Sequence, residues 1–160
     1  FSENSFVVSP LTNDKNELLA SLKTVNDRSY KKLGEGTNFN GAFQQGIYSL
    51  GQVESKSVFL FTDGVYSNID SKKENIIPTE VLQNKRIKTN VVILATDDFY
   101  NPPIYKDKHG NLLFGELKSP KVDTVFAHLA HKTNGSFKRI CNSRELSNFD
   151  VVSFFNNNKF

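Results

Sequence analysis

The hydrophobic and polar positions change period repeatedly along the chain, which is the pattern of a sheet flanked by helices. Strands are predicted at residues 5–9, 57–61, 90–95 and 137–141. The runs at 57–61 and 90–95 are near-continuous apolar or β-branched segments, typical of strands buried on both faces. Segments with apolar residues at helical spacing separate these runs. The pattern predicts an α/β fold, a doubly wound and mostly parallel sheet with helices on both faces.

The helical segments have recognisable start and stop signals. Asp14 is a typical N-cap, with Glu17 three residues later, and the apolar stripe that follows should cover one face of the sheet; this stripe consists of Leu18, Leu19, Leu22 and Val25. Further helices are expected at residues 39–50, 78–86, 122–130 and 143–149, the last capped by Ser143. Gly51 and Gly135 are placed to end two of them.

Residues 101–120 interrupt the alternation of strands and helices. Apolar residues 104–105 and 112–114 flank the turn sequence Lys-His-Gly-Asn at 108–111, which is a hairpin signal. We interpret this segment as an insertion on the ligand edge of the sheet.

Composition limits the class of protein. A length of 160 residues, 38% hydrophobic and 23% charged, predicts a single globular domain over residues 1–160. The formal charge of +3 comes from 20 basic and 17 acidic residues spread along the chain, so nucleic acid is not the expected partner. Cys141 is the only cysteine, and we interpret it as a small buried hydrophobe. No apolar run is long enough to span a membrane, so no membrane contact is expected from this segment.

Two loops carry candidate metal ligands. Asp63 directly follows the apolar run 57–61, at the carboxyl end of a predicted strand, where ligands gather in open parallel sheets. Thr37 lies in the sequence Gly-Glu-Gly-Thr-Asn at 34–38, just before a predicted helix. Both side chains offer the oxygen atoms that Mg²⁺ prefers. From spacing alone the structural interpretation is favoured: Thr37 caps the helix and Asp63 accepts backbone hydrogen bonds in a turn.

Other residues of the same loops are supporting candidates. Gly36 and Gly64 would allow close backbone approach or positive φ beside the site. Asn38, Tyr66 and Ser67 are candidate contacts for a partner, although polar loop residues are commonly just solvent-facing.

Together, the two loops resemble the von Willebrand factor A domain. A Gly-Thr loop and a strand-ending Thr-Asp-Gly, here at 36–37 and 62–64, supply two of the three elements of that family's metal-ion-dependent adhesion site. Residues 1–12 are similar to its "F...PLT" stretch, and residues 129–137 to its "LA..TGG.F" stretch. The resemblance implies Mg²⁺, or Mn²⁺ or Ca²⁺, bound by Thr37 and Asp63.

The family's third element, an Asp-x-Ser-x-Ser loop after the first strand, is absent from the sequence. By resemblance, that strand and the helix after it would precede Phe1, so we expect an N-terminally truncated domain that does not hold the metal alone. The missing strand lies centrally in the family, and its loss should leave a gap with unpaired strand edges. Residues 149–155 are the only spare apolar run, and we expect them to be helical.

The sequences "NPPIYKDKHGN" at 101–111 and "LAHKTNG" at 129–135 resemble the aerotolerance-type bacterial proteins of this family. That subfamily is usually anchored in a membrane, with this domain on the extracytoplasmic face. The resemblance therefore implies a bacterial, membrane-anchored parent protein.

The expected function is a non-enzymatic protein-binding module, in which an open coordination position on the metal accepts a carboxylate from a protein partner. Two alternatives remain. Asp97 and Asp98 also follow a strand, and with Asp63 they could form a carboxylate cluster for metal-assisted hydrolysis or phosphoryl transfer, although no nucleophile or general base is evident. His128 and His131 share a helix face but lack a third ligand. The other alternative is an interaction domain that needs no metal.

Overall fold

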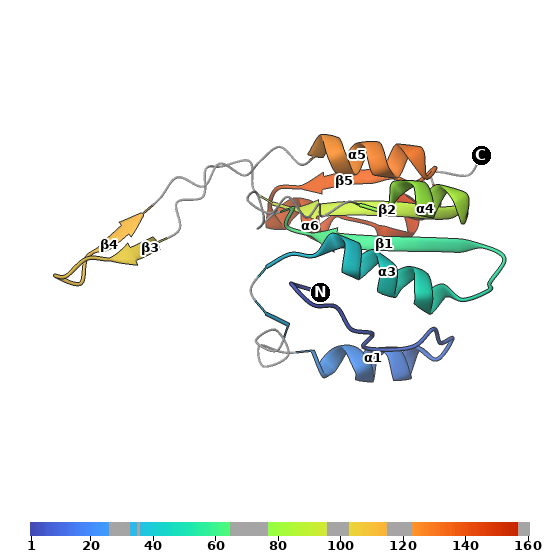
Figure 1. Ribbon diagram of the computed structural model, residues 1–160, viewed down its shortest axis with the longest axis horizontal. Helices are drawn as coiled ribbons and strands as arrows, with labels where there is room; N and C mark the ends of the chain where they lie inside the picture. The colour runs from blue at the N-terminus through green and yellow to red at the C-terminus, as the bar shows by residue number, and fades with distance from the viewer. Residues whose placement is uncertain (26–32, 35, 65–76, 96–102, 115–122, 157–160) are drawn as a thin grey trace. The chain divides into compact units, whose positions relative to one another are not determined.

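The computed structural model describes the chain except for residues 26–32, 35, 65–76, 96–102, 115–122 and 157–160 (Figure 1). The described residues form two compact units, Phe1–Val58 with Tyr66–Thr89, and Phe59–Val65 with Asn90–Phe160. In chain order the elements are helices α1 (Lys15–Lys23) and α3 (Phe39–Leu50), strand β1 (Lys56–Thr62), helix α4 (Thr79–Asn84), strands β2 (Ile87–Leu94), β3 (Pro103–Lys106) and β4 (Leu112–Phe114), helix α5 (Asp123–Lys132), strand β5 (Phe137–Ile140), and helices α6 (Ser143–Ser147) and α7 (Val151–Asn156).

A parallel three-stranded sheet in the order β1-β2-β5 confirms the α/β fold class. Strand β2 pairs in parallel with β5, from Val91 opposite Phe137 to Leu94 opposite Ile140. The run Val91, Val92 and Ile93 is completely buried, as expected for a central strand covered on both faces. The strands predicted at 57–61, 90–95 and 137–141 therefore correspond to the three strands of this sheet.

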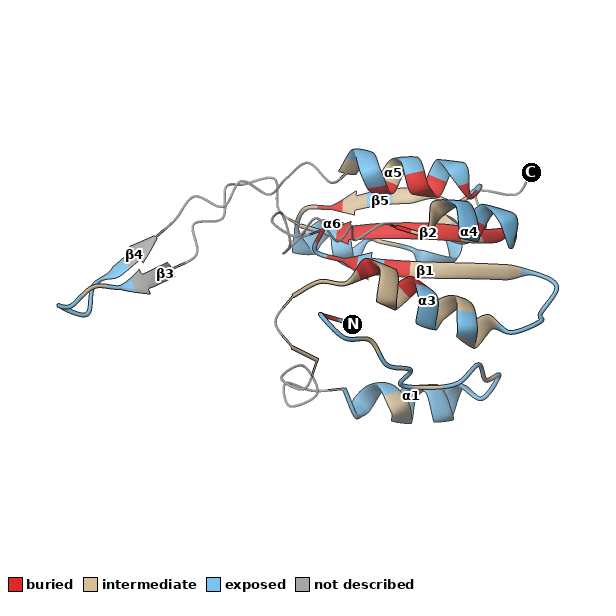
Figure 2. Cartoon of the chain, in the orientation of Figure 1, coloured by how far each residue is buried: buried red, intermediate tan, exposed pale blue. Residues whose placement is uncertain are grey.

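Helix α5 provides the main packing surface of the second unit. Phe126, Leu129 and Ala130 are buried and form a stripe at i, i+3 and i+4 that faces β5 (Figure 2). An ion pair also joins the two elements, since Arg139 Nη1 of β5 lies 2.7 Å from Asp123 Oδ1 in the first turn of α5. Hydrophobic burial and this pair fix the helix on its strand.

The end of α5 differs in detail from the prediction. Gly135 donates its backbone N–H to the Ala130 carbonyl at 2.7 Å, and Asn134 donates to the His131 carbonyl at 3.2 Å, which together form a Schellman motif. The left-handed residue of this motif is Asn134, with φ of 56°, and not the glycine. Asparagine tolerates this conformation because its short polar side chain can hydrogen-bond locally.

In the first unit, α3 and α4 each bury one side. Phe39 and Phe43 of α3 are buried, and Leu82 of α4 is fully buried. Helix α3 ends at Gly51, as predicted; its φ of 55° is positive and favours glycine, although its ψ of −135° differs from the left-handed helical stop conformation. Both helices were predicted, with ends within two residues of those observed.

The N-terminal segment contradicts two predictions. Residues 5–9 are not a strand, and α1 buries none of its residues, although Asp14 caps it by accepting hydrogen bonds from the N–H groups of Asn16 and Glu17. The expected covering of a sheet face by α1 is therefore wrong. A strand requires a neighbour for its backbone groups, and no described strand pairs with residues 5–9. The apolar side chains of this segment are consequently exposed; they are Phe6, Val7, Val8, Leu11, Leu18, Leu19, Leu22 and Val25.

The C-terminal apolar run is helical, as predicted, and forms α7. Phe154 of this helix contacts Phe59 of β1 with ring centroids 5.9 Å apart, and Phe149 with centroids 5.4 Å apart. The cap of α6 differs from the prediction, because Asn142 and not Ser143 accepts a hydrogen bond from the Glu145 N–H. This run does not replace a missing strand.

The predicted hairpin is present. Strands β3 and β4 pair antiparallel, and Asp107 organises the turn by accepting hydrogen bonds from the backbone N–H groups of His109 and Asn111, at 2.8 and 2.9 Å. The Asn111 side-chain amide donates a third, at 3.0 Å. Both connections of the hairpin, 96–102 and 115–122, lie outside the described residues, so its place on the ligand edge stays a prediction.

Asn111→Ala should raise the pKa of Asp107 toward its ordinary value. The side-chain bond from Asn111, then the backbone bonds, stabilise the carboxylate and lower the pKa of Asp107. Because the folded pKa is depressed, this stabilisation is present above the unfolded-state pKa and is lost as pH falls through the folded pKa. A carboxyl ¹³C NMR titration measures the change. Asp150, whose pKa is lowered by hydrogen bonding to Ser153, is the internal control and should not move; an unchanged Asp107 would contradict the assignment.

Candidate functional site

The loop that contains Thr37 is held by the N-terminal residues. Ser2 is buried, and its hydroxyl oxygen lies 2.7 Å from the carbonyl oxygens of both Gly34 and Gly36. The Ser2 carbonyl in turn accepts the Asn38 N–H at 2.8 Å. This contact spans more than thirty positions of sequence and fixes the backbone on either side of Thr37. Ser2 is thus a positioning residue that sequence spacing did not indicate.

Asn38 caps the helix after this loop. Its side-chain oxygen accepts the Gly41 N–H at 2.9 Å, which satisfies one of the orphan donors at the start of α3. The structural interpretation of Thr37 as the cap is therefore wrong. Thr37 is partly buried and precedes the cap by one residue. The side-chain oxygen of Asn38 serves the helix, while its role as a partner contact stays a prediction.

Glycine at position 34 is required by the same arrangement. Its φ of 83° lies in the left-handed region that favours glycine, and a Cβ there would also displace the flexible end of the Glu3 side chain. The sequence Gly-Glu-Gly-Thr therefore combines a conformational requirement with a close approach of the N-terminal segment.

The second loop begins where β1 ends. Thr62 is buried, and its hydroxyl accepts the Gly64 N–H at 3.0 Å, which closes a tight turn around Asp63. Gly64 is buried with φ of 76°. Asp63 itself is exposed. Asp63 therefore directly follows β1, as predicted, but the strand is only partly buried: Leu60 and Thr62 are buried and Phe61 is 45% exposed. Its role as a metal ligand stays a prediction.

The two halves of the candidate site belong to different units: Thr37 to the first and Asp63 to the second. Both offer hard oxygen donors, a hydroxyl and an exposed carboxylate, so the chemistry of each fits Mg²⁺, which also keeps several waters. Tyr66 and Ser67 lie outside the described residues, as do Asp97 and Asp98.

Other potential ligands do not cluster in the described part of the chain. It contains no group of three or more His, Cys, Asp or Glu residues that could hold a metal ion. His128 and His131 are both exposed on α5, and His109 is exposed in the hairpin turn. Cys141 is partly buried and, contrary to expectation, not a core residue.

The sequence matches no family model and no curated protein. Solved structures that share its fold include two from Bacteroides. The hypothetical protein BatB from Bacteroides thetaiotaomicron has a TM-score of 0.62 and 17% identity, over 92% of this chain and 75% of that chain. An aerotolerance-related membrane protein from Bacteroides fragilis has a TM-score of 0.61 and 19% identity, over 92% of this chain and 73% of that chain. At these identities the likeness shows the fold.

No helix among the described residues has the length and apolar character to cross a membrane.

Proposed function

We propose that this chain belongs to a non-enzymatic protein-binding module of the von Willebrand factor A type, with an adhesion-type metal site. The observation that carries the proposal is the exposed Asp63 carboxylate, presented by a tight turn at the carboxyl end of β1. Its support is the fold shared with BatB and the aerotolerance-related protein.

In this proposal Asp63 and Thr37 supply two of the oxygen ligands of a divalent cation, Mg²⁺ in the first instance and Mn²⁺ or Ca²⁺ as alternatives. The remaining protein ligands would come from an Asp-x-Ser-x-Ser loop outside these 160 residues. A metal ion held in this way supplies an open position for an anionic oxygen. The loops at 34–38 and 62–64 would then orient a carboxylate from the partner protein.

The exposed N-terminal apolar surface supports a missing structural element. Phe6, Val7 and Val8 are 38–51% exposed, and Leu22 of α1 is 55% exposed. Exposed apolar clusters of this kind mark surfaces that contact something else. An additional strand that carried the missing loop would pair with residues 5–9 and cover the stripe of α1.

We further propose that the parent protein is bacterial and membrane-anchored, with this domain on the extracytoplasmic face. The support is that the structural neighbour from Bacteroides fragilis is an aerotolerance-related membrane protein.

Metal-dependent recognition of a carboxylate tests the function. A form of the protein that contains the Asp-x-Ser-x-Ser loop should bind an immobilised glutamate-rich peptide in Mg²⁺ and lose binding in EDTA, as measured by biolayer interferometry. Thr37→Ala should weaken binding at least about tenfold, the loss expected from removing one ligand or its orienting partner. Thr124→Ala, at an exposed position of α5, is the control. Equal binding in EDTA would support a metal-independent interaction domain and contradict the proposal.

A further inference from the structure

A groove separates α3 and α4 in the first unit. None of the residues that line it belongs to the loops at 34–38 and 62–64 of the candidate metal site. Its volume is about 480 Å³, within the range of ligand sites. Five lining residues come from α3 and the turn after it, and three from the α4 segment; they are Gln44, Ile47, Tyr48, Gly51, Gln52, Pro78, Val81 and Lys85. All belong to the same compact unit.

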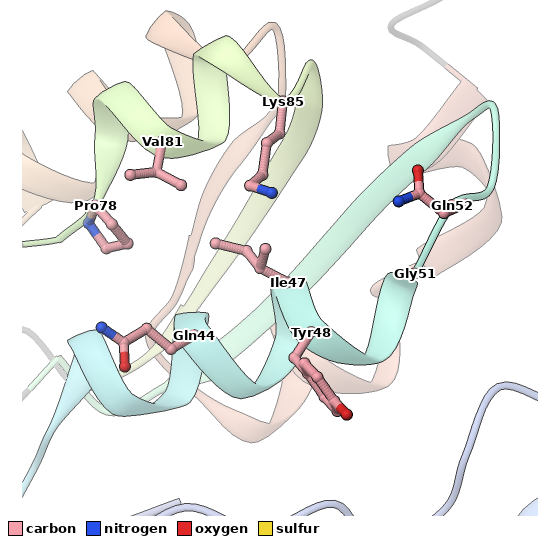
Figure 3. Close-up of a pocket in the computed structure, with 8 residues that line it drawn as sticks. All are labelled: Gln44, Ile47, Tyr48, Gly51, Gln52, Pro78, Val81 and Lys85. Atoms are coloured by element: carbon pink, nitrogen blue, oxygen red, sulfur yellow. The ribbon is translucent and has the colours of Figure 1, made fainter.

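The centre of the groove is apolar. Ile47 points from α3 toward α4, and Val81 points back toward α3, with Pro78 beside it (Figure 3). Val81 is 43% exposed although the next residue, Leu82, is completely buried. Helix α4 therefore packs into the core with the side that carries Leu82, and its Val81 side chain lies in the groove.

Lys85 gives the groove a positive charge. It is the only charged residue that lines the groove in the described part of the chain, and Figure 3 shows its ammonium group turned toward the α3 side. Lys85 makes no ion pair with a described residue. The next residue, Arg86, is also exposed. An apolar surface edged by an available cation is complementary to an aliphatic side chain next to a carboxylate.

We propose that this groove is a second, metal-independent docking site, for a short peptide segment of a protein partner. An aliphatic side chain of the peptide packs against Ile47, Pro78 and Val81, and the carboxylate of an adjacent acidic residue pairs with Lys85. Peptides of this kind combine an anchor that fills a pocket with a rim charge that sets orientation.

The test uses a peptide with the sequence Gly-Ser-Leu-Glu-Gly-Ser, blocked at both ends, titrated into the ¹⁵N-labelled 160-residue chain in EDTA. Saturable shifts of the amide signals of Ile47, Val81 and Lys85 are expected. Val81→Ser should weaken binding about tenfold, the value of one buried aliphatic contact. Val125→Ser, an equally exposed valine on α5, should leave binding unchanged.

A charge reversal separates the specific pairing from general attraction. Lys85→Glu should weaken binding of the Leu-Glu peptide and strengthen binding of a Leu-Lys peptide, while Lys138→Glu, at an exposed position of β5, should change neither. All substituted positions are exposed, so the variants should keep the wild-type circular dichroism spectrum. Absence of saturable shifts, or shifts confined to other surfaces, would overturn the proposal. Because EDTA is present throughout, either result leaves the proposed metal site untouched.

Discussion

Phe126→Ala should lower the free energy of unfolding by about 3–5 kcal/mol, the usual cost of truncating a buried aromatic residue. Phe126 has no exposed surface and lies in the stripe of α5 that faces β5. Its removal loses the transfer free energy of the ring and leaves a cavity between helix and strand. Urea denaturation followed by circular dichroism measures the change. The loss is a large fraction of the stability of a small domain, so much of the variant could unfold.

Two matched variants define what this result means. Val125→Ala changes the neighbouring residue, which is 44% exposed, and Leu22→Ala changes an apolar residue of α1 that is 55% exposed. Each should change the free energy of unfolding by no more than about 0.5 kcal/mol, as exposed substitutions usually do. A loss of several kcal/mol for Leu22→Ala would show that α1 packs into a core in solution, contrary to its exposure here.

Hydrophobic periodicity predicted most of the fold because the relevant forces are local to each element. The run at 90–95 lies in β2, which is almost entirely buried, because β-branched and apolar residues suit strands covered on both faces. The run at 57–61 becomes β1, which is a strand as predicted but only partly buried. Helix α5 follows from a stripe that can be counted directly in the sequence. These predictions needed no knowledge of which elements meet in space.

The failure at residues 5–9 has a physical cause. Their composition favours a strand, but a strand is stable only when its backbone groups pair with a neighbour. No described strand supplies that pairing, and the segment is irregular with exposed apolar side chains. Local pattern cannot tell whether a partner exists. The prediction that α1 covers a sheet face failed for the same reason. Amphipathicity shows which side of a helix can pack, but not what that side packs against.

Sequence patterns also predicted the wrong terminal residue at three helix boundaries. Asn38, Asn134 and Asn142 perform the roles that the sequence suggested for Thr37, Gly135 and Ser143. Neighbouring residues in each pair can make similar hydrogen bonds. The choice between them depends on backbone dihedrals set by the packed structure, so element existence was predictable and its terminal residue was not.

The candidate site was partly predictable. Asp63 follows its strand as expected, because the strand pattern and the turn sequence Thr-Asp-Gly are both local. The positioning role of Ser2 was not predictable. Its contacts with Gly34 and Gly36 join segments that are distant in sequence, and a serine near the start of a chain carries no distinctive signal.

Asp63→Ala should abolish most metal affinity in a form of the protein that includes the Asp-x-Ser-x-Ser loop. Removing a carboxylate ligand should cost about 100-fold or more in affinity, since loss of groups that merely orient a ligand already costs about 10–100-fold. The reason is that Asp63 would supply a charged oxygen donor from the end of β1. Glu54→Ala removes an equal charge from an exposed loop position and should leave metal affinity unchanged. Equal losses in both variants would indicate a general effect of net charge.

The most direct measurement is an isothermal titration of Mg²⁺ and Mn²⁺ into two proteins, the 160-residue chain and a form extended to include the proposed Asp-x-Ser-x-Ser loop, with thermal stability followed in parallel. The proposed site predicts saturable binding and metal-dependent stabilisation for the longer form, little binding for the 160-residue chain, and loss of the effect with Asp63→Ala. Tight binding by the 160-residue chain itself would mean that Thr37 and Asp63 have other protein ligands and would favour the carboxylate-cluster enzyme. No binding by either form would contradict the adhesion-type site.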